Sequence, residues 1–257
     1  MNHASFREIE IFCNELLTPE DFDDSCFNGI QIETNEPIRK ILVAVTISDQ
    51  IVDQAIDNKV QAILVHHGFF GKDLFSLRGQ RHKLVTKMLE NKIGLSAYHL
   101  PLDAHPEVGN NVALADILEL ENREKFYVGL IGQLPKVKTA KEVGEKLKED
   151  SFQYLFISNP DRKINKVCVL TGVGGYYAMD QKLFYDGSQF DLFITGDINE
   201  YPALLGDEIG FSFMALGHDN SEKLGVARLA RVISEKFGVD YIEGENKLEF
   251  ISNKFEL

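Results

Sequence analysis

The stretch from Lys40 to Gly68, KILVAVTISDQIVDQAIDNKVQAILVHHG, contains three successive patterns. Residues 41–47 form a short β-branched apolar run, residues 49–58 are amphipathic at helical spacing, and residues 62–65 form a second apolar run. Both runs are apolar at consecutive positions, which is typical of strands covered by helices on both faces. The stretch therefore predicts a strand, a helix and a strand, which is the repeating unit of a parallel sheet.

The same alternation continues through most of the chain. Further apolar runs predict strands at Gly94–Tyr98, Val167–Leu170, Leu192–Ile194 and Phe213–Leu216. Amphipathic stretches predict helices at Lys83–Asn91, Asn111–Leu118, Tyr176–Tyr185 and Glu222–Phe237. Strands and helices that alternate in this way predict an α/β fold with largely parallel sheets.

Two halves of the chain are weakly similar, because in each of them three predicted strands end in small or polar residues. The segment between them, Tyr127–Asn165, has a different pattern: a strand at 128–134, a helix rich in lysine and glutamate at 139–149, and a strand at 153–158. We therefore predict two related α/β lobes, residues 1–125 and 126–257, whose polar strand ends face one cleft. We expect the C-terminal helix to pack back on the first lobe.

The composition limits the classes of partner. The 257 residues include 27 Lys+Arg and 40 Asp+Glu, a net charge of −13, and so acidic a surface disfavours binding to nucleic acid or anionic lipid. No run of about 18 apolar residues predicts a membrane helix, and residues 1–8 lack the apolar core of a signal peptide. The three cysteines are scattered without CxxC spacing. These features predict a cytoplasmic protein.

Side chains that bind metals cluster at the predicted strand ends, where open α/β sheets bind their ligands. His66 and His67 follow the run that ends at Val65, Asp103 follows the strand that ends near Tyr98, and His218 follows the run that ends at Leu216. Glu222 lies four residues after His218, at the start of a predicted helix, and so shares a helix face with it.

The adjacent histidines indicate more than one ion. Neighbouring side chains on a regular strand point to opposite faces, but at a strand end before Gly68 the chain can turn so that both imidazoles face the cleft. Three imidazoles and two carboxylates leave two open coordination shells if Glu222 bridges the ions. Two ions about 3.5–4 Å apart can activate water and polarise a substrate atom. The five residues therefore predict a two-metal centre and a metal-dependent hydrolase.

Each of these residues also has an ordinary structural interpretation. A lone histidine at a strand end is usually hydrogen-bonded for structural reasons, Asp103 could cap a turn, and the charge of Glu222 would suit the first turn of a helix. The convergence of the five at one predicted edge favours metal binding. His99 and His105 flank Asp103 and could orient ligands, bind substrate or move protons, so we expect them, with Glu222, to be the catalytic side chains.

Two other features could hold an anion. Lys72, Arg78 and Arg81 belong to a basic island at residues 72–83 of an acidic protein, where they could neutralise a phosphorylated substrate; the alternative is a solvated basic face. The glycines of Thr171-Gly172-Val173-Gly174-Gly175 follow a strand, so their amides could cradle an anion, although a full GxGxxG is lacking.

The ordered motifs resemble those of the GTP cyclohydrolase 1 type 2 family, also called the Nif-three-like or dinuclear metal centre hexameric family. The resemblance extends from about Phe6 to Ile242 and suits the short bacterial form. It rests on the following segments: Phe27-Asn28-Gly29-Ile30-Gln31-Ile32-Glu33, His66-His67-Gly68-Phe69-Phe70, Tyr98-His99-Leu100-Pro101-Leu102-Asp103-Ala104-His105-Pro106 with Gly109-Asn110-Asn111, Ile194-Thr195-Gly196-Asp197, and Gly217-His218 with Glu222 and Gly225.

The resemblance implies a ligand set, an assembly and a reaction. The family's two adjacent histidines fall on His66 and His67, its aspartate on Asp103, and its late histidine and bridging glutamate on His218 and Glu222. It implies two divalent ions per subunit (zinc, iron or manganese), and a toroidal homohexamer whose metal sites face an internal cavity. The attributed reaction opens the imidazole ring of GTP, a purine nucleotide, to give formate and dihydroneopterin triphosphate.

The chain departs from the family pattern at two positions. Many members have His or Tyr after the late histidine, where this chain has Asp219, and Glu is usual where Asp197 stands. Neither change touches the five expected ligands, but both bear on the pocket and so on the substrate. Two alternatives stay open: a metal-dependent phosphatase or other nucleotide hydrolase, and a hexameric metal-binding scaffold without activity.

Overall fold

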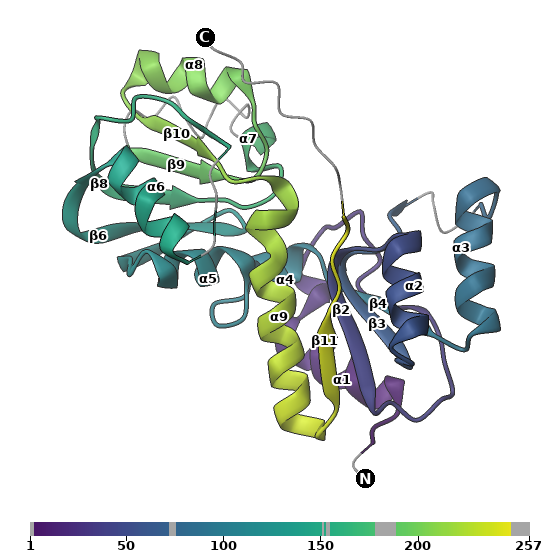
Figure 1. The fold of residues 1–257 in the computed structure, drawn as a ribbon. Coiled ribbons are helices and arrows are strands. Elements are labelled where there is room, and N and C mark those ends of the chain that lie inside the picture. The colour runs from purple at the N-terminus through teal and green to yellow at the C-terminus, as the bar shows by residue number, and fades with distance from the viewer. Residues whose placement is uncertain (1–2, 72–75, 151, 153–154, 178–188, 248–257) are drawn as a thin grey trace.

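The structure is a computed structural model that describes residues 3–71, 76–150, 152, 155–177 and 189–247. These residues form two mixed sheets, each covered by helices on both faces (Figure 1). The long helix α9 (His218–Phe237) extends from the second sheet to the first, where it lies beside strand β11 (Asp240–Glu243) (Figure 1). The α/β fold with largely parallel sheets is confirmed.

The first sheet has five strands in the order β1-β4-β3-β2-β11. Their bounds are β1 Gly29–Ile32, β2 Lys40–Thr46, β3 Ala62–His67, β4 Gly94–Ala97 and β11 Asp240–Glu243. All neighbours are parallel except β1, which pairs antiparallel with β4. The last described strand of the chain therefore completes the sheet that the first strands begin.

The consecutive apolar residues of β2 serve two cores. Ile41, Val43 and Val45 face a core formed with α1 (Phe6–Leu17) and α9. Leu42 and Ala44 face the opposite core, formed with the helices α2 (Asp49–Asp57) and α3 (Gly79–Glu90). Full burial of one such aliphatic side chain contributes about 1.5–3 kcal/mol. The strand is apolar from Ile41 to Val45 because both of its faces are buried there, as the sequence predicts.

The second sheet has six strands in the order β5-β6-β8-β9-β10-β7. Their bounds are β5 Glu121–Phe126, β6 Gly129–Thr139, β7 Phe156–Ile157, β8 Lys163–Val169, β9 Leu192–Thr195 and β10 Ser212–Ala215. Only β8, β9 and β10 are parallel to one another. Each sheet thus contains three parallel strands that follow one another along the chain, while a common origin of the two lobes stays a prediction.

Helices cover the second sheet in the same way. The helices α5 (Asn110–Ile117) and α6 (Ala140–Glu149) pack on one face, and α8 (Glu200–Ile209) packs on the other, against an aromatic core. The side chains of Thr139 and Glu142 form a capping box that fixes the first turn of α6. The short helix α4 (Leu100–Ala104) and the 3₁₀ turn Pro19–Asp21 complete the connections near the first sheet.

Three predicted helices differ from the structure, and one of them, α3, begins at Gly79, four residues before its predicted start at Lys83. The predicted helix Glu222–Phe237 begins four residues earlier, at His218, so the histidine and the glutamate share one helix from its first turn. Of the predicted helix Tyr176–Tyr185, residues 176–177 lie in the short helix α7 (Gly174–Tyr177) and the rest fall outside the described residues. No described helix combines the length and apolarity that crossing a bilayer requires.

The lobe division after residue 125 stays a prediction. Strand β5 already belongs to the second sheet and β11 belongs to the first, so the chain crosses between the sheets twice. The C-terminal half of α9 contributes Leu229, Ala230 and Ile233 to the core of the first sheet. A helix that starts on one sheet and packs on the other can carry side chains from the second half to the strand ends of the first.

Candidate metal centre

The structure brings the five predicted ligands together at the junction of the two sheets. His66 and His67 are the last residues of β3, and Asp103 lies in α4 beyond the end of β4. His218 and Glu222 lie in the first two turns of α9, which starts just after β10. The carboxyl ends of strands from both sheets thus contribute to one centre, as the rule for open α/β sheets predicts.

The adjacent histidines reach the centre without the predicted turn at Gly68, because His67 is still part of β3 and pairs with Thr46. Their rings lean toward opposite neighbouring strands. His66 Nδ1 donates to the carbonyl of Tyr98 at 2.9 Å, and His67 Nδ1 lies 2.9 Å from the hydroxyl of Thr46. Both Nε2 atoms are thereby left for the centre. Gly68 serves close packing instead, since a Cβ there would lie 2.3 Å from Gln31 Oε1.

Glu222 lies between two groups of donors. Its Oε1 is 3.6 Å from His66 Nε2, whereas its Oε2 is 3.2 Å from His67 Nε2 and 3.1 Å from His218 Nε2. Asp103 Oδ2 is 3.5 Å from His66 Nε2. The donor atoms of His66, Asp103 and Glu222 lie within 4.8 Å of one another, and so do those of His67, His218 and Glu222. The two groups share only the carboxylate of Glu222.

Within the part of the chain that the structure describes, this cluster contains buried polar atoms without hydrogen-bond partners, and the pKa values of several of its side chains are strongly shifted. Among the described residues, neither His66 Nε2 nor Glu222 Oε2 has a hydrogen-bond partner, although both atoms are buried. Burial lowers the pKa of His66, but Asp103 and Glu222 outweigh it and raise that pKa well above its usual value. Burial and the charge of His66 lower the pKa of His67 to about 3. Burial raises the pKa of Glu222, but the imidazoles outweigh it and lower that pKa.

Divalent cations fit this arrangement. Buried polar atoms that lack partners are costly, and an ion between them would satisfy both. Three imidazoles and two carboxylates form a mixed nitrogen and oxygen donor set, which suits zinc, iron and manganese. Each group supplies three donors and leaves coordination positions open, as catalytic sites do.

His218 lies on the open side of the centre. Its side chain is 35% exposed, against 0% for His66 and 14% for His67. Its Nδ1 donates to Asp197 Oδ1 at 3.1 Å, so Asp197 orients the imidazole of this candidate ligand. Burial lowers the pKa of His218, but Glu222 and Asp197 outweigh it and raise that pKa to about 9. Of the three candidate histidine ligands, His218 is therefore the one most accessible from solvent.

Two buried asparagines support the centre, a role that the sequence analysis missed. Asn110 Nδ2 donates to Asp103 Oδ1 at 2.9 Å, and its Oδ1 accepts from the backbone of Gly225 in α9 at 2.7 Å. Asn111 accepts from the backbone of Thr171 at 2.9 Å and donates to the carbonyl of Asp103 at 3.0 Å. Asn110 and Asn111 are the first two residues of α5, close to the predicted helix start at Asn111. Through Gly225 and Thr171 they also connect the two halves of the chain. Their signal was a pair of amides at the start of a largely apolar helix.

Gly172 has a different role from the anion cradle considered above. Its φ of +64° is in the left-handed region that favours glycine, and a Cβ there would lie 2.0 Å from Glu222 Oε1 and 3.3 Å from His218 Nε2. Its N–H donates to the hydroxyl of Ser221. The loop therefore lies against the carboxylate of Glu222, which makes it an unfavourable place for an anion.

The two predicted catalytic histidines differ in position. His99 faces the centre, because its donor nitrogen lies within 4.8 Å of those of His66 and His67, and its Nδ1 is 2.9 Å from Asp24 Oδ1. His105 lies outside the three donor groups found among the described residues. Its Nδ1 accepts from the backbone N–H groups of Glu107 and Val108, which gives it a role in the turn after α4.

The predicted basic residues separate as well. Arg81 lies in α3, with its guanidinium 5.8 Å from the ring centroid of Phe69, and lines a pocket of about 360 Å³ together with Gly68 and Phe69. The pocket adjoins the candidate metal centre, because its lining residue Gly68 directly follows the candidate ligand His67 in the chain. Arg78 is exposed just before α3, and Lys72 lies outside the described residues.

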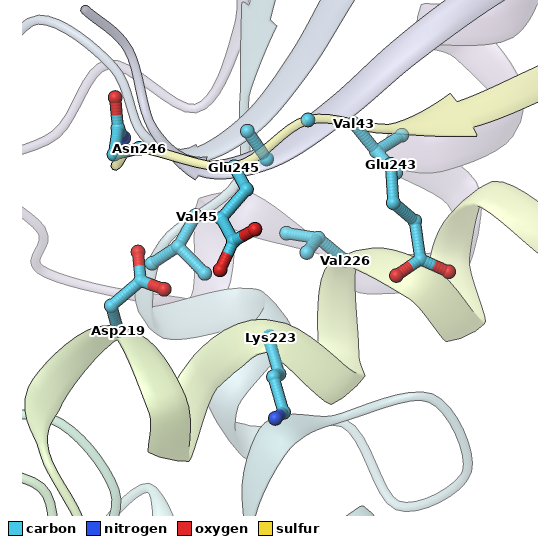
Figure 2. Close-up of a pocket in the computed structure, with 10 residues that line it drawn as sticks. Val43, Val45, Asp219, Lys223, Val226, Glu243, Glu245 and Asn246 are labelled. Atoms are coloured by element: carbon cyan, nitrogen blue, oxygen red, sulfur yellow. The ribbon is translucent and has the colours of Figure 1, made fainter. Parts of the chain in front are cut away.

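A second pocket, of about 260 Å³, lies on another face of α9 (Figure 2). Asp219 and Lys223, each one residue after a candidate ligand, line it with Val43, Glu243 and Glu245. Burial and the charge of Glu222 raise the pKa of Asp219. Asp219, one of the two departures from the family pattern, thus faces this pocket and lies outside the donor groups found among the described residues.

Sequence relatives are similar to this chain over nearly its whole length. It is 34% identical over 242 residues to a GTP cyclohydrolase 1 type 2 homolog of Haemophilus influenzae, with 91% of this chain and 94% of that protein covered. It is 33% identical over 252 residues to the homolog of Pyrococcus horikoshii, with 93% and 97% covered.

Solved structures also superpose on this chain over nearly its whole length. The protein ybgI, described as of unknown function, superposes with a TM-score of 0.85 at 29% identity, over 95% of this chain and 99% of that one. TTHA1606 from Thermus thermophilus gives a TM-score of 0.84 at 26% identity, over 96% and 100%. Residues 4–252 also match the family Duf34/NIF3 (NGG1p interacting factor 3). The chain belongs to the Duf34/NIF3 family, many of whose members are named GTP cyclohydrolase 1 type 2 homologs.

Proposed function

We propose that this chain is a dinuclear metal-dependent hydrolase that acts on a purine nucleotide. The observation that carries the proposal is the position of Glu222, whose two oxygens face different groups of donors: Oε1 faces His66, and Oε2 faces His67 and His218. A carboxylate shared in this way is what a bridging ligand between two ions requires. The open coordination positions favour catalysis over a purely structural role.

The reaction is proposed from the names of the relatives, which are GTP cyclohydrolase 1 type 2 homologs. It would open the imidazole ring of GTP to give formate and dihydroneopterin triphosphate. Two bound ions would supply Lewis-acid polarisation and activation of water. One ion would be held by His66, Asp103 and Glu222, and the other by His67, His218 and Glu222.

The protein's own residues have three tasks in this proposal. Hydrogen bonds at Nδ1 hold His66 and His218 with Nε2 toward the centre, so the ligands are oriented before any ion binds. His99, on the same side as His66 and His67, faces the reacting group. Arg81, in the pocket that adjoins His67, would meet the phosphate groups of the substrate. His105 has no part in this arrangement.

Metal content and turnover test the proposal together. We expect purified protein to contain two divalent ions per chain by elemental analysis and to release formate from GTP. Glu222→Ala should lose the second ion and reduce turnover more than about 10²-fold, because it removes the shared ligand. Glu235→Ala is the matched control, since Glu235 is an exposed glutamate of the same helix that pairs with Arg231.

Other outcomes identify the alternatives. Release of inorganic phosphate without formate would replace the cyclohydrolase with a phosphatase at the same centre. Two bound ions without turnover on any purine nucleotide would favour the metal-binding scaffold. Wild-type protein that binds no divalent ion would overturn the proposal as a whole.

Two further properties are part of the proposal. Assembly into a homohexamer follows from the family resemblance, and light scattering of the metal-loaded protein would test it by giving six chains per particle. A cytoplasmic location agrees with the three free cysteines, none of which forms a disulfide in the structure of the described residues.

A further inference from the structure

A fourth histidine, His99, faces the centre beside the five predicted ligands and forms a third donor group with His66 and His67. The ring of His99 lies 5.0 Å from that of His66 and 5.5 Å from that of His67, measured between centroids. Its side chain is 20% exposed, which is intermediate between those of the buried His66 and the open His218. His99 therefore lies beside the two ion positions on a side that small molecules can reach.

A buried carboxylate holds this histidine. The side chain of Asp24 is 2% exposed, and its Oδ1 lies 2.9 Å from His99 Nδ1. The same oxygen accepts from the backbone N–H of Cys26 at 2.9 Å, while Oδ2 accepts from the backbone N–H of Leu100 at 3.0 Å and from the amide of Asn28 at 3.1 Å. Asp24 thus connects the loop before β1 to the start of α4.

The contacts of Asp24 decide which nitrogen of His99 carries the proton. Three N–H donors, from Cys26, Leu100 and Asn28, already face the two carboxylate oxygens, and hydrogen bonds of this kind favour the ionised form of a carboxyl group. An ionised carboxylate only accepts. His99 Nδ1 must therefore donate, which leaves the lone pair of the neutral ring on Nε2.

We propose that Asp24 is a positioning residue that fixes His99 in its Nδ1–H tautomer, with the Nε2 lone pair directed at the centre. His99 then accepts a hydrogen bond from an O–H or N–H group at the reacting position, such as water or a ring N–H of the substrate. Asn28 assists, because its side-chain oxygen accepts from the backbone N–H of His99 at 2.8 Å. This role rests on the proposed function of the centre, but the tautomer itself does not.

The tautomer is measurable without turnover. Protein with ¹⁵N-labelled histidine, loaded with zinc, would be studied by magic-angle-spinning NMR, which tolerates a large assembly. Signals of His99 are assigned by their loss in His99→Gln. We expect a protonated Nδ1 and an unprotonated Nε2 in the wild type. A protonated Nε2 on neutral His99 in the wild type would overturn the proposal, whatever any variant does.

Asp24→Asn tests the cause. An amide at this position must turn its NH₂ either toward His99 and Cys26 or toward Leu100 and Asn28. The first orientation is favoured, because an NH₂ in the second would face two donors, Leu100 and Asn28, whereas in the first it faces only the N–H of Cys26. The amide then donates to His99 Nδ1, so we expect the Nε2–H tautomer to appear. Asp23→Asn, at the exposed neighbouring aspartate, is the control and should leave the tautomer unchanged. Folded Asp24→Asn protein with an unchanged tautomer would refute the role of Asp24.

Turnover adds an independent measurement. If the centre is catalytic, we expect Asp24→Asn to lower kcat about 10²-fold or more while the zinc content and KM stay near those of the wild type. Loss of zinc in step with kcat would show a merely structural role and contradict the proposal. If wild-type protein binds two ions but has no activity, the proposed function fails while the tautomer result stands.

Discussion

The two halves of the chain contribute to the centre in different ways. The first half supplies His66 and His67 from the end of β3 and Asp103 from α4, the helix that follows the neighbouring strand β4. All three side chains are at most 14% exposed. The second half supplies His218 and Glu222 from one helix, with His218 35% exposed. The first half therefore contributes only buried candidate ligands, whereas the second half contributes one buried side chain, Glu222, and one that is partly exposed, His218.

The largest effect should come from removing one ligand on each side. His66→Ala deletes a fully buried imidazole that faces both carboxylates, so we expect the ion that it shares with Asp103 to be lost, and the second ion to be weakened. His218→Ala should lose only the ion that it shares with His67. Zinc stoichiometry by elemental analysis measures both. Equal loss in the two variants would break the distinction between the two halves.

Gly172→Ala tests whether the second half holds Glu222 in place. The new methyl group would occupy the space of Glu222 Oε1, and the left-handed φ adds about 1 kcal/mol of backbone strain. We expect zinc affinity to fall about 10–100-fold, the range found when groups around metal ligands are changed. Gly79→Ala is the control, because the φ of Gly79 is +54°, which is also left-handed, and a Cβ there would meet nothing within 4 Å. Zinc titrations of both variants would show the difference.

The asparagines that join the halves should give a smaller effect. Asn110→Ala removes a hydrogen bond to the Asp103 carboxylate and leaves the backbone N–H of Gly225 without its acceptor. We expect a loss of about 1–3 kcal/mol in the free energy of unfolding, measured with urea. Asn111→Ala should cost a similar amount but affect zinc affinity less, because its contacts are to backbone atoms. A larger affinity loss for Asn111→Ala would contradict this assignment.

Stability against acid should depend on the Asp24 loop of the first half. The folded pKa of Asp24 is about 2 and the unfolded value is about 3.9. A depressed folded pKa stabilises the protein above the unfolded pKa, and this contribution is lost as the pH falls from about 4 toward 2. We therefore expect the stability difference between wild type and Asp24→Asn to be constant near neutral pH and to shrink below about pH 4. A difference that stays constant down to about pH 3 would exclude this ionisation.

The smallest effect is expected for the thiols, whose reactivity should be equally low in the two halves. Burial raises the pKa of Cys26 in the first half to about 12 and that of Cys168 in the second half well above its usual value. Cys13 is likewise buried, with a pKa raised to about 12. Since the thiolate is the reactive form, we expect no reaction with a thiol reagent at about pH 8 until the protein unfolds. Rapid labelling of Cys26 alone would show that its loop opens.

The sequence predicted those parts of the fold and site that depend on local patterns. The consecutive apolar residues of β2 and β3 predicted buried parallel strands, and the strand ends predicted where His66, His67 and His218 would lie. The return of β11 to the first sheet was not predicted, because a four-residue strand of mixed burial gives no periodic signal. The roles of Asp24, Asn110 and Gly172 depend on contacts between segments far apart in the chain, so no local pattern could reveal them.

The start of α9 at His218 also shows the limit of local signals. Gly217 provides no side-chain cap for this helix, so clear helical periodicity in the sequence begins only at Glu222. The structure starts the helix where β10 ends, because the backbone of Ser221 donates to the carbonyl of Gly217. Tertiary packing of α9 on α5 and β2, rather than propensity, sets this boundary.

The order of the chain has a consequence for synthesis in the cell. A ribosome that has completed residue 217 has made His66, His67 and Asp103, but neither of the ligands on α9 nor strand β11. Such a nascent chain lacks two of the five candidate ligands, and one edge of its first sheet is still open beside β2. The candidate centre is therefore completed late in synthesis, and the first sheet must wait for the last elements of the chain before it is complete.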